Sequence, residues 1–533
     1  MPNTFDRNGS ALRFVHGGPN HRQRLGCAPR GGKGSSESTT NGGMHMSKRF
    51  LMRLGKTPFE VFDGFDTLDR NTIGRNNGNL IFGMAAHKLF STADTVVDAN
   101  RYKINGAMAA KVNDEYDGFI LPLANAFRPG FEAELARTTD FIEKLTIPFL
   151  MLSGGAQLPL DGDPAALKKI EPTVRRFAKA VLEKSSALTV RGELTADYLK
   201  SLGFKDVIVV GCPSMTMNGR GHRVDKPDEL PSGAAIAYNL QTNNPFGADL
   251  ILDAESNYDA TYMPQDLATL EFMLWGTGPY QGHDRSLPLD RSHPQFMEKK
   301  AQFQLDAPEW MRRMGEQRFS FGPRIHGNVA GILAGTPGIV LAHDGRTLEL
   351  SRYHGVPAID LTAEEAPETV AELYEMADFS EFNRGHAERF DRLADFIHDN
   401  GFSHIYEPGQ EKALADYNRR LDAVEFPEPQ TSLWQDTPPE FVRMASVLQQ
   451  RYLALKKTQK ALKPGTGSAE AAELEKRVRD LEKRLSRTEA ALKRSQASAA
   501  EVRATANRTD RRLNKLLGIP LGVKNMLGRR RPR

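Results

Sequence analysis

Short apolar runs alternate with helical patterns between residues 58 and 425 of this chain. The runs are rich in β-branched residues and nearly continuous, which is typical of parallel strands buried on both faces. Amphipathic stretches with helical spacing lie between them, for example at residues 130–144, 172–184 and 194–202. We predict strands at residues 95–98, 118–124, 147–153, 187–190, 206–211, 234–239, 319–322, 338–342 and 358–361.

This repeated β–α–β order indicates an α/β fold with parallel sheets. The strands form two sets, which are separated by a long segment over residues 240–318. We therefore expect two Rossmann-like domains that face a cleft, the first over residues 49–220 and the second over residues 221–430. Ligands of open parallel sheets bind beyond the carboxyl ends of the strands, so the loops after the strands are the candidate site.

The two ends of the chain differ from this body. Residues 1–48 are rich in Gly, Ser, Asn and Arg with almost no apolar periodicity, and we predict that they are disordered. A helix and a linker are predicted over residues 431–467. Residues 468–517 keep a heptad repeat, which predicts a coiled coil that forms a dimer or trimer or folds back on the body. Residues 518–533 form a basic tail.

Charge separates the same three parts. The 533 residues carry a net charge of +4 at pH 7. Residues 1–48 hold seven Lys or Arg and two Asp or Glu, a net charge of +5, and residues 468–533 hold eighteen and eight, a net charge of +10. The body between them is therefore acidic, at −11. The basic ends favour contact with an anionic membrane surface over nucleic acid, because the tail has no interleaved aromatic residues; plain solubilising charge is the alternative.

Several classes of protein are disfavoured by composition. No run of about 20 apolar residues predicts a membrane span, and the N-terminus has no apolar segment of the secretory type. The two cysteines, Cys27 and Cys212, cannot make a disulfide framework, and no Cys/His spacing predicts a zinc site. We expect a cytoplasmic protein without a metal, attached to a membrane at most peripherally.

The segment after the strand at residues 319–322 carries the strongest candidate site. If Arg324 and His326 end an extended stretch, their spacing puts both side chains on one face. A helix is expected directly after them, over residues 327–334, and its free N–H groups from Gly327 onward favour an anion. Arg, His and helix would then converge on a ligand that carries carboxylate or phosphate. A structural Arg pair with a capping His is the alternative.

Charged residues follow two further strands. Arg191 would bring a cation to the cleft after the strand at residues 187–190, unless it pairs with a glutamate at the surface. Asp344 is a plausible N-cap for a helix that holds Arg346 and Glu349. Arg346 would add charge to the anion site and Glu349 would bind hydroxyls or transfer protons, unless both belong to a charged helix surface.

Two turns after strands carry weaker signals. Gly154 and Gly155 form a glycine turn that lets a ligand approach the backbone, and Gln157 would hydrogen-bond that ligand, unless the segment is an ordinary strand-to-loop turn. Cys212 stands in a Gly-Cys-Pro segment with no histidine nearby in sequence. A catalytic thiol needs a base, so we interpret Cys212 as part of a tight turn that closes the first domain.

These segments together resemble the polysaccharide pyruvyl transferase family, and they follow one another in the family's order. The family's usual first strand is not recognisable before residue 77. The matching stretches are NGNL (77–80), LPLANAFR (121–128), LTVRGE (188–193), VVGCPS (209–214), RIHG (324–327) and DGRTLEL (344–350).

The resemblance implies a glycosyltransferase-B-like architecture, with the site between two Rossmann-like domains. It implies transfer of a pyruvyl group from phosphoenolpyruvate to two hydroxyls of a sugar in a surface polysaccharide or exopolysaccharide, which forms a ketal, with no further cofactor. Arg191, Arg324 and His326 match the positions expected to hold the donor, and His326 is the candidate for one proton transfer. The partners expected are phosphoenolpyruvate, a saccharide acceptor for which a lipid-linked glycan is a candidate, and further copies of the chain through the coiled coil.

Two other functions stay open at this point. A nucleotide-sugar glycosyltransferase would share the fold, and Glu349 would then hold a ribose. A non-catalytic scaffold would use the coiled coil to recruit partners and would keep only a degenerate site.

Overall fold

The computed structural model describes residues 47–241, 247–275, 287–360 and 366–433, together with Val478, Arg479 and five positions between residues 481 and 490. The predicted disordered head up to residue 46 and the basic tail lie outside the described residues, as do the segment from residue 434 and nearly all of the predicted coiled coil. Those predictions therefore stay predictions.

The first half of the described chain builds a parallel sheet with the strand order β2-β1-β3-β4. A two-stranded parallel sheet, β5-β6, continues it through a bridge between Gly154 and Val190. The strands are β1 (Lys48–Met52), β2 (Thr95–Ala99), β3 (Gly118–Pro122), β4 (Phe149–Leu152), β5 (Leu188–Val190) and β6 (Val207–Val209).

The second half builds a five-stranded parallel sheet with the order β11-β10-β9-β7-β8. The predicted α/β class with parallel sheets is thus confirmed. The strands are β7 (Ala235–Tyr238), β8 (Asp259–Tyr262), β9 (Phe319–Gly322), β10 (Gly338–Ala342) and β11 (Ala358–Asp360).

Continuous apolar runs form central strands because both faces of the sheet are covered. In β3 the side chains of Phe119 and Leu121 join one hydrophobic core, and that of Ile120 joins the core on the opposite face. All three side chains are fully buried. Alternate residues of a strand point to opposite faces, so neither face tolerates a polar position here.

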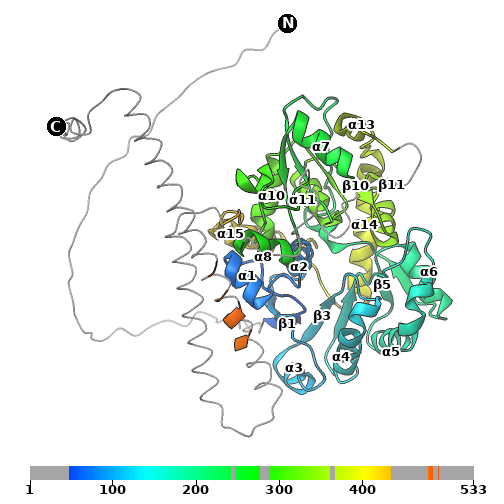
Figure 1. Cartoon of the computed structure of the whole chain (residues 1–533). Helices are drawn as coiled ribbons and strands as arrows, with labels where there is room; N and C mark the ends of the chain where they lie inside the picture. Colours follow the sequence, from blue (N-terminus) through cyan, green and yellow to red (C-terminus); the bar gives the residue numbers. More distant parts are fainter. Residues whose placement is uncertain are drawn as a thin grey trace, which may run out of the picture. The chain divides into compact units, whose positions relative to one another are not determined.

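Helices connect the strands and cover both sheets (Figure 1). Those in the first half are α1 (Gly64–Arg70), α2 (Gly78–Leu89), α3 (Ala109–Glu115), η1 (Pro129–Phe131), α4 (Glu132–Ile142), η2 (Pro164–Ile170), α5 (Glu171–Leu182), α6 (Glu193–Ser201) and η3 (Pro213–Thr216). Those in the second half are α7 (Ala248–Asn257), α8 (Leu267–Trp275), α9 (Pro294–Met297), α10 (Ala307–Gly315), α11 (Ile325–Ala334), α12 (Gly345–His354), α13 (Val370–Glu375), α14 (Ser380–Asp399) and α15 (Glu411–Asp422). None of the described helices is both long enough and apolar enough to cross a bilayer.

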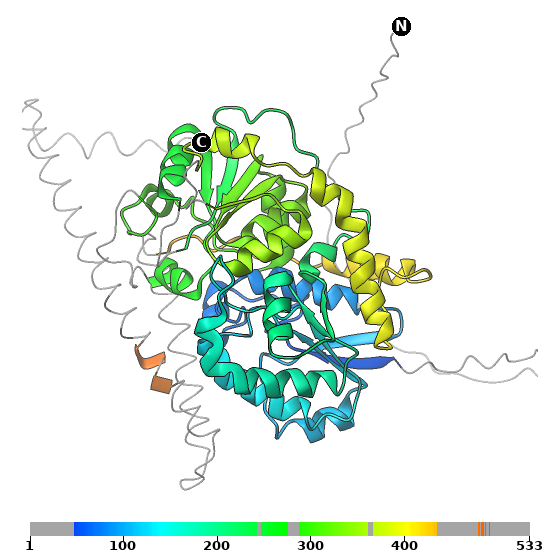
Figure 2. The ribbon, with the colours of Figure 1, turned by 90° about the vertical axis from the view of Figure 1, so that its right-hand side faces the viewer.

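The chain crosses between the two sheets near both ends of the described body. Leu68 of α1 and Ile81 of α2 pack into the core of the second sheet. In the other direction, Phe382 near the start of α14 packs with the second sheet, whereas Leu393 and Ile397 near its end pack with the first. Figure 2 shows α14, in yellow, running from one sheet to the other. The end of the expected second domain therefore completes the core of the first.

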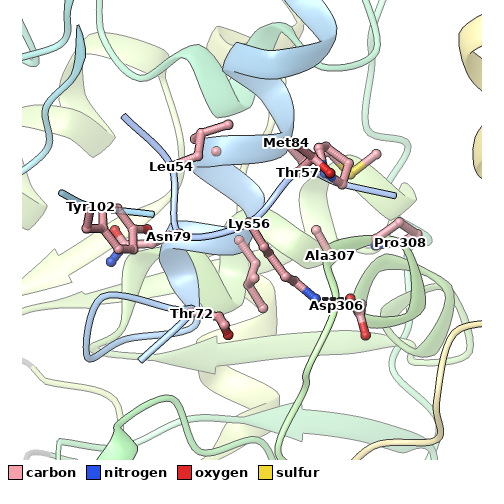
Figure 3. A pocket seen from close by; sticks show the side chains of 14 residues that line it. Leu54, Lys56, Thr57, Thr72, Asn79, Met84, Tyr102, Asp306, Ala307 and Pro308 are labelled. Atoms are coloured by element: carbon pink, nitrogen blue, oxygen red, sulfur yellow. Dashed lines mark hydrogen bonds and ion pairs between the residues drawn. The ribbon is translucent and has the colours of Figure 1, made fainter. Parts of the chain in front are cut away.

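A buried ion pair also joins the two halves. Lys56 follows β1, and its ammonium group contacts the carboxylate of Asp306, which stands at the N-cap position of α10 and makes no capping hydrogen bond with its side chain (Figure 3). The Lys56 Nζ also donates a hydrogen bond of 3.0 Å to the carbonyl of Leu305. Both charged side chains are almost fully buried, at 4% and 2% exposure.

Two strands were absent from the predictions. β1 was missed because only three consecutive apolar residues, Phe50 to Met52, follow the glycine-rich head, and a strand does exist before residue 77. β8 lies inside the segment predicted to separate the two sets of strands. It is an edge strand with an exposed Asp259, so its pattern is less apolar than that of a central strand.

Candidate active site

A cavity of about 320 Å³ lies between the two halves, and its charge is strongly unbalanced. Six arginines and one aspartate line it, and the described lining contains no lysine. Amide side chains and the ring of Phe131 complete the wall. The charged lining residues are Arg53, Arg75, Arg128, Arg191, Arg324, Arg346 and Asp266.

Four of the six arginines reach the cavity because they follow the carboxyl ends of parallel strands. Arg53 directly follows β1, Arg191 directly follows β5, and Arg324 stands two residues after β9. Arg346 lies in the first turn of α12, after β10, where Asp344 caps the helix as predicted and forms a capping box with Thr347. The fold thus brings cations from both sheets to one place.

The N-terminus of α11 differs from the prediction in one respect. Arg324 is the N-cap with extended dihedral angles, but the helix already begins at Ile325, so His326 is a helical residue rather than the end of a strand. Both side chains still line the cavity. His326 fits because Gly78, at the start of α2, has no side chain: a Cβ there would lie 2.8 Å from the Cβ of His326.

Gly327 and Gly155 have packing roles that the sequence did not reveal. A Cβ at Gly327 would lie 2.6 Å from the amide nitrogens of Asn239 and Gln265, so the glycine admits two side chains at the helix start. A Cβ at Gly155 would lie 2.7 Å from the carbonyl oxygen of Ala124 and 3.2 Å from Cδ of Arg191. The predicted glycine turn therefore makes room for protein atoms.

His326 is buried beside two positively charged arginines. Burial, with the positive charges of Arg191 and Arg346 added, holds the pKa of His326 well below its ordinary value. Its Nε2 lies 3.7 Å from the Sγ of Cys212. Cys212 does stand in a tight turn before η3, as predicted, but a histidine distant in sequence is its neighbour in space.

Arg191 is completely buried beneath the cavity. Its Nε donates a hydrogen bond of 3.3 Å to the carbonyl of Ser153, and its guanidinium carbon lies 5.2 Å from the ring centroid of Phe82. Burial lowers the pKa of Arg191, yet the described residues offer no partner to its Nη1. Four further buried donors in the lining also have no partner among the described residues: Arg53 Nε, Arg324 Nε, Arg346 Nε and Gln265 Nε2.

Arg324 has one strong partner. Its Nη2 donates to both carboxylate oxygens of Asp266, at 2.8 and 2.7 Å. This pair neutralises part of the positive charge of the cavity, while the unpartnered Nε of Arg324 keeps one donor for a ligand.

Three predicted site residues, Gly327, Glu349 and Gln157, lie outside the cavity lining. Both carboxylate oxygens of Glu349 accept hydrogen bonds from Thr195 in α6, one from the backbone N–H at 2.8 Å and one from the hydroxyl at 2.7 Å. Burial raises the pKa of Glu349 to about 7 despite these bonds. Gln157 is exposed, and its Oε1 lies 3.5 Å from the amide nitrogen of Asn125.

Sequence reasoning missed Arg53, Arg75, Arg128, Asp266 and the contact of Cys212. Arg128 stands within a stretch that carried the family resemblance, so a signal for it was present. Arg53 gave no such signal, because β1 itself was not recognised. A group that could bind a metal exists among the described residues, His398, His404 and Glu407, but none of these side chains lines the cavity.

Comparisons with known proteins bear on this site. Residues 129–345 match the model of the polysaccharide pyruvyl transferase family, which confirms the resemblance over that part of the chain. No curated protein matches the chain in sequence. The family match supports a transferase that modifies a polysaccharide.

Solved structures similar to the chain have low identities. A functionally uncharacterised protein of Klebsiella pneumoniae is 12% identical with a TM-score of 0.30, covering 61% of this chain and 92% of its own. The UDP complex of Staphylococcus aureus MnaA is 10% identical with a TM-score of 0.32, covering 72% of this chain and 99% of the MnaA chain. The glycosyltransferase SnogD of Streptomyces nogalater is 11% identical with a TM-score of 0.28, covering 70% of this chain and 99% of the SnogD chain.

Proposed function

We propose that this protein transfers a pyruvyl group from phosphoenolpyruvate to a saccharide and so forms a ketal. The match of residues 129–345 to the polysaccharide pyruvyl transferase family supports this reaction. The observation that carries the proposal is the cavity in which six arginines face one aspartate. Phosphoenolpyruvate joins a phosphate and a carboxylate in one small molecule, and guanidinium forks bind both groups bidentately. The proposal needs no cofactor beyond this donor.

The donor would occupy the part of the cavity formed by Arg191, Arg346 and the start of α11. The orphan Nη1 of Arg191 and the orphan Nε of Arg346 are donors that an anion would satisfy. The dipole of α11 would also favour an anion there, although the N–H of Gly327 in its first turn already donates to the carbonyl of Arg324 at 2.9 Å. Burial of these groups strengthens their interaction with charge, because water screens them little.

The reaction balances without a redox step. The terminal carbon of the enol takes a proton and becomes a methyl group, while carbon 2 forms bonds to two hydroxyl oxygens of the sugar and loses its bond to the phosphate oxygen. One of the two hydroxyl protons thus balances the proton taken up by carbon, and the other leaves with the phosphate. Preorganised arginines would stabilise the phosphate as it departs.

His326 fits the role of proton acceptor in this scheme. Its depressed pKa keeps the imidazole neutral near pH 7, so a ring nitrogen is free to accept a proton from an attacking hydroxyl. The bound anions would stabilise the resulting imidazolium. This role is consistent with its place on the cavity wall beside Arg324.

The two alternative functions have less support. A nucleotide-sugar transferase would use Glu349 to hold a ribose, but both oxygens of that carboxylate accept hydrogen bonds from Thr195. A scaffold without catalysis would leave the unbalanced charge of the cavity without a purpose.

The test is an assay of phosphate release from phosphoenolpyruvate with a panel of candidate glycans, with the ketal methyl group detected by NMR. We expect turnover by the wild-type chain and a loss of about a hundredfold or more in the Arg324→Ala/His326→Ala variant. Arg137→Ala on α4 is the matched control, because Arg137 is exposed at the surface. Full activity of the double variant would contradict the site assignment. Thermal stabilisation by a nucleoside diphosphate but not by phosphoenolpyruvate would favour the glycosyltransferase.

A further inference from the structure

The arginines of the cavity fall into two groups. Arg191 and Arg346 act on His326, since these two are the charges that depress its pKa. Arg53, Arg75 and Arg128 come from the first half of the chain, and we call them the first-domain arginine cluster. Burial, followed by repulsion from Arg346, Arg53 and Arg75, lowers the pKa of Arg128 to about 10, which still leaves it charged near pH 7.

Aromatic rings hold this cluster in place without neutralising it. The guanidinium carbons of Arg53 and Arg128 lie 5.8 and 4.9 Å from the ring centroid of Phe131. Arg53 also lies 5.0 Å from the ring centroid of Tyr102. Stacking of this kind fixes the plane of a guanidinium. The Nη1 of Arg128 also donates to the carbonyl of Asn125, and the remaining guanidinium N–H groups of the two arginines stay available to an anion.

The cluster makes no close ion pair in the described part of the chain, although the more distant carboxylate of Glu134 acts on the pKa of Arg53, which burial lowers. No carboxylate among the described residues lies within 4.0 Å of the guanidinium groups of Arg53, Arg75 or Arg128, in contrast to the pair that Asp266 makes with Arg324. The Nε of Arg53 is buried and has no hydrogen-bond partner there. A desolvated cation without a partner is costly, so such a wall is suited to a ligand that brings negative charge.

The donor alone does not account for this charge. Six arginines, less Asp266 and the Asp344 carboxylate that pairs with Arg346, leave an excess of four positive charges, whereas phosphoenolpyruvate carries about three negative ones at neutral pH. Beside the cluster, Asn125 presents a buried Oδ1 that lacks a partner among the described residues. An amide oxygen of this kind accepts a hydrogen bond from a hydroxyl group.

We propose that the first-domain arginine cluster binds the second substrate, and that this acceptor is a saccharide with an anionic group of its own, a phosphate or a carboxylate. Asn125 would accept a hydrogen bond from a hydroxyl of the same sugar. The proposal rests on the proposed function, because it takes the other arginines as the donor site. According to this proposal, the protein selects its acceptor by negative charge as well as by the identity of the sugar.

The experiment measures binding to the full chain by titration calorimetry, with two kinds of probe. Phosphoenolpyruvate reports on the donor site. Glucose 1-phosphate, glucuronate and neutral glucose, added to the chain both with and without an excess of phosphoenolpyruvate, report on the cluster and distinguish phosphate from carboxylate. The variants are Arg53→Gln/Arg128→Gln for the cluster, Arg191→Gln for the donor site, and Arg137→Gln as the surface control, each checked for an unchanged unfolding transition.

We expect at least one anionic sugar to bind about tenfold or more tightly than glucose, since each charge-assisted hydrogen bond contributes on this scale. The cluster variant should lose this preference and bind phosphoenolpyruvate within about threefold of wild type, and Arg191→Gln should show the reverse. Equal binding of all three sugars, or loss of both ligands in the cluster variant, would overturn the proposal. Two bound molecules of phosphoenolpyruvate, one lost in the cluster variant, would also overturn it. Anionic sugars that bind while phosphoenolpyruvate does not would contradict the proposed donor and leave the cluster assignment standing.

Discussion

Two polar regions lie between the halves of this protein, and they treat buried charge in opposite ways. Around Lys56, a small cavity lined by Tyr102, Met84 and Asp306 holds one cation against one anion, with the two side chains pointing toward one another (Figure 3). In the larger cavity six guanidinium groups face one carboxylate of the lining, Asp266, and only one further carboxylate of the described residues, that of Asp344 behind the lining, pairs with them, at 3.3 Å from Arg346. A cation that is paired with an anion needs no further partner, whereas buried cations in excess of the anions are stabilised when an anionic ligand binds. The balance of charge therefore distinguishes a structural contact from a binding site, whereas burial does not, because buried charged groups occur in both regions.

The largest expected effect comes from unbalancing the balanced pair. Lys56→Met should lower the free energy of unfolding by about 3–5 kcal/mol, because it leaves Asp306 buried without its cation. The double variant Lys56→Met/Asp306→Leu should recover most of this loss. Urea unfolding measures both. Lys412→Met is the control, since Lys412 is 88% exposed in its pair with Asp416 and its loss should change stability by at most about 0.5 kcal/mol. If the two lysine substitutions changed the free energy of unfolding equally, burial of the Lys56–Asp306 pair would not explain the effect.

An intermediate case is Glu349, a buried carboxylate that has hydrogen bonds instead of an ion pair. Its pKa of about 7 in the folded state exceeds the ordinary value of 4.5, so the folded chain holds a proton that the unfolded chain releases. The stability that this proton provides is fully present below pH 4.5 and is lost as pH rises through 7. Relative to Glu349→Gln, the wild-type chain should therefore lose about 3 kcal/mol of stability between pH 4.5 and pH 8.

Denaturant unfolding of both chains at several pH values between 4.5 and 8 measures this difference. Glu375→Gln, at an exposed position of α13, is the control and should track the wild type across the range. If the difference between wild type and Glu349→Gln does not change with pH, the carboxylate is ionised throughout and its pKa is not raised.

The smallest effect on stability is expected in the unbalanced cavity. Arg128→Leu removes a half-buried cation that has no counter-charge among the described residues, so the anion-free chain should be as stable as wild type or more stable by about 1 kcal/mol. Inorganic phosphate should raise the melting temperature of the variant less than that of the wild type. Calorimetric melting with and without phosphate measures both changes. A loss of several kcal/mol without ligand would mean that Arg128 is structural.

The sequence could predict those parts of the molecule that depend on local pattern. Continuous apolar runs predicted nine of the strands, and the position of Arg191 and Arg324 after such runs predicted that both line the cavity. Asp344 was predicted as a cap because its spacing to Thr347 is local.

Features that depend on the packing of distant segments could not be predicted. The contact of Cys212 with His326 joins residues 114 positions apart, and no local pattern encodes it. Glu349 was expected at the ligand, but the N-terminus of α6 presents the Thr195 N–H and hydroxyl to its carboxylate instead. Arg53 was not predicted because the strand before it, β1, has only five residues, two of them polar. Such a segment resembles a loop when its neighbouring strands are unknown.

The crossing of α14 has a consequence for how the protein is made. One face of the first sheet, with Ile120 and Leu150, is closed by Leu393, Phe396 and other side chains near the end of α14. During translation Leu89 and Phe90 at the end of α2 are available to cover part of this face, but the part that packs with α14 stays uncovered until about 270 further residues have followed β3. The nascent chain would have to keep apolar strands apart from other chains throughout this interval. Truncations that end before α14 should accordingly yield an insoluble first half rather than an independent domain.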